Sequence, residues 1–192
     1  YSIAAQARAV LEIAPPGCVM VGHSMGAQVA VEAARQAPER VAGVVLLDAA
    51  FIAPTEKALA FGEGLRAQLA RVDIPRMIEA FGRNQFVAPP ADPAAVDALI
   101  AVMRATDPAV TRAAWDAILD WDGRTAFAAL ACPILAVAID KPINRLADLA
   151  RLNPRCMTGQ VAGSGHMVQF EAMPQVEAMI RRFFSLSFGS GG

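Results

Sequence analysis

The sequence predicts an α/β fold in which a parallel sheet is interrupted by a helical insertion. Short apolar runs that suit buried parallel strands alternate with segments of helical periodicity near both ends of the chain. Residues 55–121 show helical patterns and no convincing strand. The 192 residues correspond to one ordinary domain, and 55% of them are hydrophobic, which is ample material for a core.

The first part of the chain has the pattern helix, strand, helix, strand. Apolar residues recur at helical spacing up to Leu11, and Pro15-Pro16-Gly17 ends that helix. The apolar runs that follow are short, as expected of strands buried on both faces. The expected elements are a helix over residues 2–13, a strand over 18–21, a tight turn over 22–26, a helix over 27–36 and a strand over 41–47.

The insertion is expected to consist of helices that begin at acidic caps. Asp92-Pro93 and Asp107-Pro108 each place an acid at an N-cap, directly before a proline in the first turn. An apolar stripe at helical spacing follows each pair. We therefore divide the chain into a core (residues 1–54 and 122–188), an inserted helical cap (residues 55–121) and a flexible tail (residues 189–192).

The sheet pattern resumes after Pro133. We expect a strand over residues 134–139 that ends at Asp140, followed by a helix that contains Leu146, Leu149 and Leu152. A last strand over residues 158–162 precedes the loop Gly163-Ser164-Gly165-His166, and Pro174 opens the final helix.

Composition excludes several classes of function. Lys and Arg number 17 and Asp and Glu 18, so the net charge of −1 offers no footprint for nucleic acid or an anionic membrane. The three cysteines are widely spaced and the histidines number two, which argues against a disulfide framework or a metal site. No GxGxxG follows a strand, so no cofactor is implied. The start is not typical of a signal peptide, so a cytoplasmic protein is expected.

The strongest chemical signal is Gly22-His23-Ser24-Met25-Gly26, which matches G-x-S-x-G between an expected strand and an expected helix. A serine nucleophile must project from a sharp strand-to-helix turn, where the crowded backbone favours glycine on both sides. The N–H of Met25 can then hold a developing oxyanion, and the helix dipole supports it. We therefore predict Ser24 as a nucleophile.

A serine hydroxyl needs a base, and His166 is the candidate. His23 lies inside the tight turn itself, so its expected role is packing or hydrogen bonding beneath that turn. His166 lies in a glycine-flanked loop, which would let its imidazole reach back over the carboxyl edge of the sheet.

The third member should be a carboxylate that orients the histidine, in the chain order serine, acid, histidine. Asp140 is favoured because it follows the strand over 134–139, and Asp48 is the rival because it follows the strand over 41–47. Both should stand at the carboxyl ends of parallel strands, where sites in open α/β sheets form.

Three segments resemble the α/β-hydrolase superfamily. VMVGHSMGAQVAVEAARQAPERVAGVVLLDAA resembles its nucleophile elbow, CPILAVAIDKPIN its acid-bearing loop, and GSGHMVQFEAMPQVEAMIRRFF its histidine loop and last helix. The resemblance covers residues 2 to about 187 and implies Ser24, Asp140 and His166 as the triad, with Met25 at the second oxyanion-hole position. The inserted helices resemble the cap of the lid-bearing members.

Two departures from the family pattern carry expectations. The acid loop lacks the glycine of Gly-x-x-Asp, since Val137 stands at that position. The family has further strands, and a loop with the first oxyanion-hole donor, before the segment where this chain begins at Tyr1. We therefore expect an N-terminally truncated hydrolase, whose strand over residues 18–21 lacks a partner on one edge and which is weakly active.

The resemblance implies a serine hydrolase that acts on a carboxylic ester or related carbonyl compound through an acyl-enzyme. The alternatives are carbon–carbon bond hydrolysis or cofactor-free peroxidation on the same fold, or a non-catalytic fragment. The expected partner is a small apolar or aromatic ester-type substrate, with the oligomeric state left open. Candidates to line its pocket are Phe51, Leu59, Phe61, Leu65, Met77, Ile78, Phe81, Phe86, Trp115 and Trp121.

Overall fold

The computed structural model describes residues 1–83, 87–88 and 92–189. Within these residues an all-parallel sheet of four strands runs in the order β1-β2-β3-β4. The strands are β1 (Cys18–His23), β2 (Val41–Leu47), β3 (Ile134–Ala138) and β4 (Cys156–Gln160). The expected α/β class is confirmed, and the last strand begins two residues earlier than the sequence indicated.

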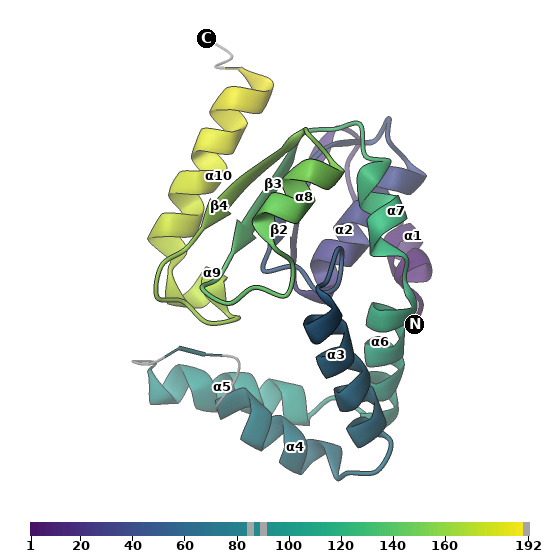
Figure 1. Ribbon diagram of the computed structural model, residues 1–192, viewed down its shortest axis with the longest axis vertical. Helices are drawn as coiled ribbons and strands as arrows, with labels where there is room; N and C mark the ends of the chain where they lie inside the picture. Colours follow the sequence, from purple (N-terminus) through teal and green to yellow (C-terminus); the bar gives the residue numbers. More distant parts are fainter. Residues whose placement is uncertain (84–86, 89–91, 190–192) are drawn as a thin grey trace.

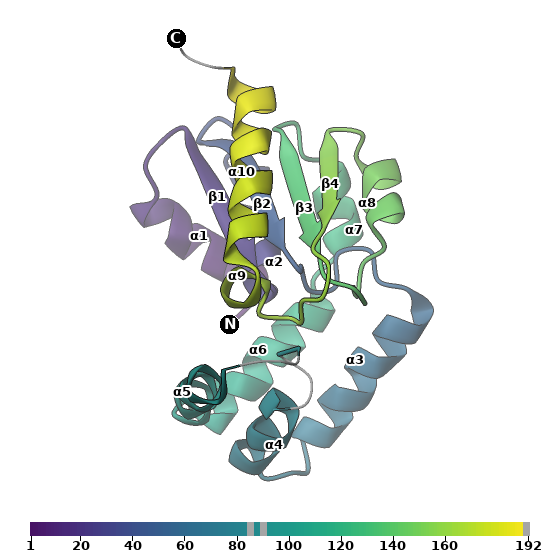
Figure 2. The same ribbon diagram turned by 90° about the vertical axis from the view of Figure 1, so that its left-hand side faces the viewer.

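Helices cover both faces of the sheet. Figure 2 shows one group behind the strands and α9 and α10 in front of them, whereas in Figure 1 α10 lies to the left of the sheet and α1, α2 and α7 lie to its right. The first group comprises α1 (Ile3–Ile13), α2 (Met25–Gln36), α7 (Gly123–Ala128) and α8 (Leu146–Leu152), and the second α9 (Val168–Glu171) and α10 (Met173–Phe188). Strand β1 forms one edge of this sheet, where the side chain of Val21 is 55% exposed.

The core lies on both sides of the sheet because successive residues of a strand point to opposite faces. In β2, Val44 and Leu46 pack toward the first group of helices, whereas Val45 and Leu47 pack toward α9 and α10. Burial on both faces explains why this strand is a continuous apolar run in the sequence.

The segment between β2 and α7 contains α3 (Glu56–Leu69), α4 (Ile74–Phe81), α5 (Pro93–Arg104) and α6 (Pro108–Asp120). These helices lie beyond the carboxyl ends of the strands (Figures 1 and 2). The side chains of Asp92 and Asp107 accept hydrogen bonds from the N–H groups of Ala94 and Ala109, so both predicted N-caps are confirmed. A small apolar cluster around Leu65, Leu69, Ile74 and Ile78 holds these helices together.

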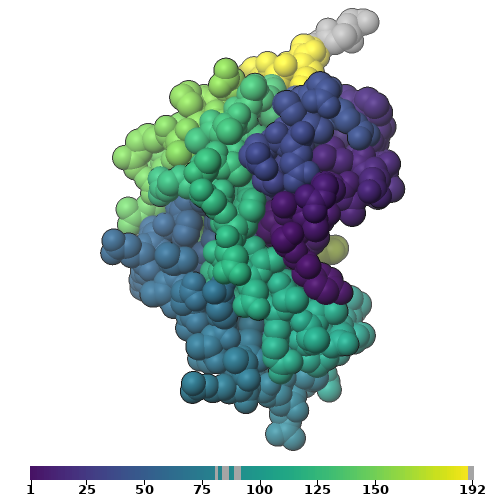
Figure 3. All heavy atoms as spheres, turned by 90° about the vertical axis from the view of Figure 1, so that its right-hand side faces the viewer, coloured from purple at the N-terminus to yellow at the C-terminus, as the bar shows by residue number. Residues whose placement is uncertain are grey.

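Polar side chains of α2 connect the core to these helices. The buried amide of Gln28 donates to the carbonyl oxygens of Phe51 (3.2 Å) and Ile118 (3.0 Å). The indole Nε1 of Trp121 donates to Glu32 Oε2 at 3.2 Å. Figure 3 shows the N-terminal segment against the helices between β2 and β3, where residues 1–4 and α6 line a hollow.

Glu32 gives this connection a pH dependence. The residue is 3% exposed, and the Arg35 guanidinium hydrogen-bonded to it lowers the pKa of its carboxyl below the usual 4.5 despite burial. Because the unfolded chain binds this proton more tightly, the contribution of ionised Glu32 to stability is complete above pH 4.5 and is lost as the pH falls through the folded pKa.

We therefore expect Glu32→Gln to destabilise the fold by about 1–2 kcal/mol at pH 7 and by less as the pH falls below 4.5. Urea denaturation at several pH values measures the difference. The control is Glu177→Gln, which removes an exposed ion pair with Arg181 and should cost less than about 0.5 kcal/mol throughout. A cost for Glu32→Gln that stays constant down to pH 3 would contradict the assignment.

Candidate active site

Ser24 occupies a strained turn between β1 and α2. Its backbone angles are φ 53° and ψ −118°, in the left-handed region that non-glycine residues rarely adopt. The N–H of Ser24 donates to the carbonyl of Leu47 in the neighbouring strand (3.1 Å), and its own carbonyl accepts from Ala50 N–H (3.1 Å). The surrounding backbone therefore fixes a conformation that is unfavourable by itself.

The two glycines of the motif differ in what they permit. A Cβ on Gly22 would lie 2.2 Å from the carbonyl oxygen of Gly26, so the backbone of β1 can pass α2 only without a side chain there. A Cβ on Gly26 would meet nothing within 4 Å among the described residues. The expected crowding is therefore found at Gly22 and not at Gly26.

Asp48 stands beside Ser24 at the carboxyl edge of the sheet. The register of β1 and β2 pairs His23 with Leu47, so the residues that follow each strand lie next to one another. The N–H of Asp48 donates to the carbonyl of Val137 (2.8 Å), and its φ of 37° is also left-handed. Its side chain is 6% exposed.

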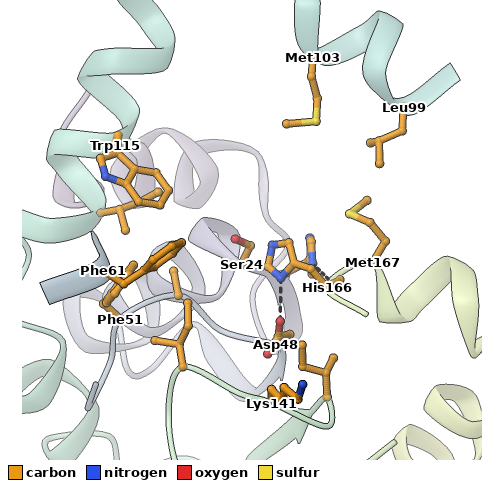
Figure 4. A pocket seen from close by; sticks show the side chains of 15 residues that line it. Ser24, Asp48, Phe51, Phe61, Leu99, Met103, Trp115, Lys141, His166 and Met167 are labelled. Carbon is orange, nitrogen blue, oxygen red and sulfur yellow. Dashed lines mark hydrogen bonds and ion pairs between the residues drawn. The ribbon is translucent and has the colours of Figure 1, made fainter. Parts of the chain in front are cut away.

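His166 reaches Asp48 from the loop that follows β4. Its Nδ1–H donates to Asp48 Oδ2 at 2.7 Å (Figure 4). This bond holds the proton of the neutral imidazole on Nδ1 and leaves Nε2 as its basic nitrogen. Ser24 and His166 line the same pocket, and Figure 4 shows them next to each other there.

The structure corrects the choice between the two aspartates as the partner of His166. Asp140 is exposed, and its Oδ1 accepts a hydrogen bond from the N–H of Gly163 at 3.3 Å instead. Strand β3 ends at Ala138, so Asp140 lies two residues beyond it in the loop, whereas Asp48 directly follows the strand next to β1. The loop of His166 thus extends past the end of β3 to reach β2.

His23 supports the backbone of His166. Its Nε2–H donates to the carbonyl oxygen of His166 (2.8 Å), and the two ring centroids are 4.5 Å apart. Burial lowers the pKa of His23 below 6.5, and the nearby His166 lowers it further. The expected hydrogen-bonding role of His23 is therefore confirmed, with the ring neutral at pH 7.

Glu171 fixes the same loop from the other side. Its Oε2 accepts hydrogen bonds from the N–H groups of Gly165 (2.9 Å) and Ala88 (2.8 Å). A Cβ on Gly165 would lie 2.6 Å from the nitrogen of Ala88, so the close approach of these two segments requires glycine. One carboxylate therefore joins the loop of His166 to the segment that precedes α5.

Sequence reasoning missed Asn144, which holds the chain that follows Asp48. The Oδ1 of this buried side chain accepts from the N–H groups of Ile52 (3.0 Å) and Ala53 (2.8 Å), and its Nδ2 donates to the carbonyls of Ala49 (2.7 Å) and Ala50 (3.0 Å). Four backbone groups thus depend on one amide. The bonds span more than 90 residues of sequence, so no local pattern could reveal them.

The pocket above Ser24 has a volume of about 420 Å³ and mostly apolar walls. Of the candidates named from the sequence, Phe51, Phe61 and Trp115 line it, whereas Leu65 and Ile78 are buried among the inserted helices. Phe86 and the side chain of Phe81 lie outside the described residues. The lining residues that sequence reasoning did not name are Ala50, Leu99, Met103, Ile118, Ile139, Lys141, Ile143 and Met167.

In the described ranges, no group of three or more His, Cys, Asp or Glu residues is arranged to hold a metal ion. None of the helices in the part of the chain that the structure describes is long and apolar enough to cross a membrane.

This chain belongs to the alpha/beta hydrolase family. The family model matches residues 1–179, which include Ser24, Asp48 and His166. No curated protein matches the chain in sequence.

Solved structures show the same fold at low sequence identity. An esterase from Thermogutta terrifontis is 20% identical with a TM-score of 0.77, and the match covers 97% of this chain and 73% of that one. A bromoperoxidase from Bacillus anthracis is 15% identical (TM-score 0.79, 93% and 71% covered). An N-acyl homoserine lactone degrading enzyme is 21% identical (TM-score 0.71, 95% and 75% covered).

We expect Gly22→Ala to destabilise the protein by about 3 kcal/mol or more, because the new methyl group meets backbone that cannot move aside. Gly26→Ala is the matched control and should change stability by less than about 1 kcal/mol, since open space surrounds that position among the described residues. Urea denaturation of the two variants tests the difference. Equal free energies of unfolding for the two variants would show that the close contact at Gly22 does not determine the stability of the protein.

We expect Asn144→Ala to cost about 2–4 kcal/mol, because four backbone groups lose a buried partner. Asn144→Asp keeps an acceptor for two N–H groups but leaves the carbonyls of Ala49 and Ala50 without donors, so it should still cost more than the exposed control Gln160→Ala. Hydrogen exchange at Ile52 and Ala53 provides a local measurement. Unchanged exchange there in Asn144→Ala would contradict this role.

Proposed function

We propose that this chain is a serine hydrolase in which Ser24 is the nucleophile, His166 the general base and Asp48 the acid that orients it. The observation that carries the proposal is the 2.7 Å hydrogen bond from His166 Nδ1 to the buried carboxylate of Asp48, in the pocket that also contains the strained Ser24. A serine at its ordinary pKa needs such a base. Membership in the hydrolase family supports the same reaction class.

In the proposed reaction, the Ser24 oxygen attacks the carbonyl carbon of an ester while its proton passes to His166 Nε2. The negative charge of the tetrahedral intermediate is stabilised by the N–H of Met25, which begins α2 and has no acceptor within that helix. The intermediate collapses to an acyl-enzyme, and the leaving alkoxide takes the proton from the imidazolium. Water activated by His166 then releases the carboxylic acid and restores Ser24.

The pocket supports an apolar or aromatic substrate. Phe51 and Trp115 pack edge to face in its wall, with ring centroids 6.2 Å apart. We treat helices α3 to α6 as the cap that encloses this substrate, because side chains of α3, α5 and α6 contribute to the lining. Burial of apolar surface there contributes about 25 cal/mol per Å².

The two aspartates provide the sharpest test. Asp48→Asn should lower kcat/KM for a p-nitrophenyl ester by about 10³–10⁴, because the histidine loses the carboxylate that orients it. Asp140→Asn should lower kcat/KM by less than about fivefold, since only an exposed hydrogen bond to Gly163 is affected. The reverse order of the two effects would return the role to Asp140.

Labelling by a fluorophosphonate checks the nucleophile independently of the substrate chosen. Intact mass spectrometry should show one adduct on the native chain and none on Ser24→Ala, with folding verified by circular dichroism. A folded native chain that is not labelled would refute the proposed hydrolase. Parallel assays with a dienol-type diketone distinguish ester from carbon–carbon bond hydrolysis.

A further inference from the structure

A second cavity adjoins the pocket above Ser24. Its volume is about 760 Å³, and it lies between α5 and the segment from the His166 loop into α9. Leu99 and Met167 line both cavities, and Figure 4 shows them together on the side of the first pocket away from Trp115. The two cavities therefore meet at this pair of side chains.

The second cavity presents an apolar surface to solvent. Val102 of α5 is 72% exposed and Phe170 of α9 is 73% exposed, although both are large apolar residues. Such side chains gathered around a cavity are typical of a ligand groove. The residues of α5 and α9 that form its apolar walls are Ala95, Val96, Ala98, Leu99, Val102 and Phe170.

The charged side chains in the described lining of this cavity disfavour an anionic ligand end. Its described lining contains the carboxylates of Asp92 and Glu171 and no Lys, Arg or His. Asp92 Oδ1 accepts from Ala94 N–H (3.0 Å), and Glu171 is bonded to two backbone N–H groups. Both carboxylates are thus fixed in place by the backbone, and a carboxylate at the end of a ligand would meet only like charge.

We propose that the second cavity binds the distal part of a medium-length, uncharged alkyl chain whose ester carbonyl is held at Ser24. This inference rests on the proposed hydrolase function and deepens it by naming the substrate class. The acyl chain passes between Leu99 and Met167, and the unbranched thioether of Met167 adapts to it. Because each methylene removed from water strengthens binding by up to about fourfold, selectivity should rise with chain length.

The first experiment compares kcat/KM for p-nitrophenyl butanoate and octanoate below their solubility limits. We expect the native chain to prefer the octanoate by at least about tenfold. Ala95→Trp places an indole in the second cavity from an exposed position of α5 and should reduce this preference at least about fivefold. Ala101→Trp is the matched control, because Ala101 is also exposed on α5 but is not among the residues that line the cavity.

The second experiment separates alkyl binding from catalysis. Calorimetric titration of Ser24→Ala with 1-decanol and with 1-butanol should show at least about tenfold tighter binding of decanol. Adding Ala95→Trp to that variant should remove most of the difference, and adding Ala101→Trp should preserve it.

The outcomes distinguish the two proposals. Hydrolysis of both esters without a chain-length preference would overturn the alkyl site and leave the hydrolase intact. Equal binding of decanol and butanol, or a preference that Ala95→Trp does not change, would also overturn it. Decanol binding that Ala95→Trp removes, without turnover of any ester, would support the cavity as an alkyl site and refute the hydrolase proposal.

Discussion

The parallel register of β1 and β2 is the constraint on which the rest of the site depends. It aligns His23 with Leu47 and so brings the residues that follow them, Ser24 and Asp48, to one level at the carboxyl edge. Each of these residues donates its N–H to a carbonyl oxygen near the carboxyl end of the neighbouring strand. Ser24 donates to Leu47, and Asp48 donates to Val137. They are also the non-glycine residues with positive φ among those described. Backbone strain is therefore concentrated at the two positions where the chain leaves adjacent strands, and sheet hydrogen bonds hold it there.

Buried polar side chains extend this constraint to the loops. Asn144 satisfies four backbone groups after Asp48, and Glu171 holds the His166 loop against the segment before α5. His23 adds a bond to the carbonyl of His166. None of these side chains has a role in the proposed reaction, yet each fixes backbone in or next to a residue of the proposed triad. Such partly enclosed hydrogen bonds are costly to break, because the groups left behind would remain without water.

Helices α3 to α6 shape the space in front of this edge. They are capped by acids, held together by their own apolar cluster and connected to α2 through Gln28 and Glu32. Their side chains enclose the pocket on one side and leave a second cavity on the other, with Leu99 and Met167 between the two. In the proposed function, the reacting groups at this edge and the walls of the pocket thus come from different parts of the chain, which is common where loops and insertions carry specificity.

The α/β class, the order of the elements and the sharp turn at Ser24 could be predicted from the amino-acid sequence alone, because hydrophobic periodicity, proline and glycine act locally. The sequence also reduced the possible bases to His166. It favoured Asp140 over Asp48, although Asp48 is the carboxylate that is hydrogen-bonded to His166. Both aspartates follow apolar strands, and they differ in how far each stands beyond its strand and in which strand is next to β1. The sequence could not reveal Asn144 or the second cavity. Those features arise from residues more than 50 positions apart in the chain, and only the packed tertiary structure brings them together.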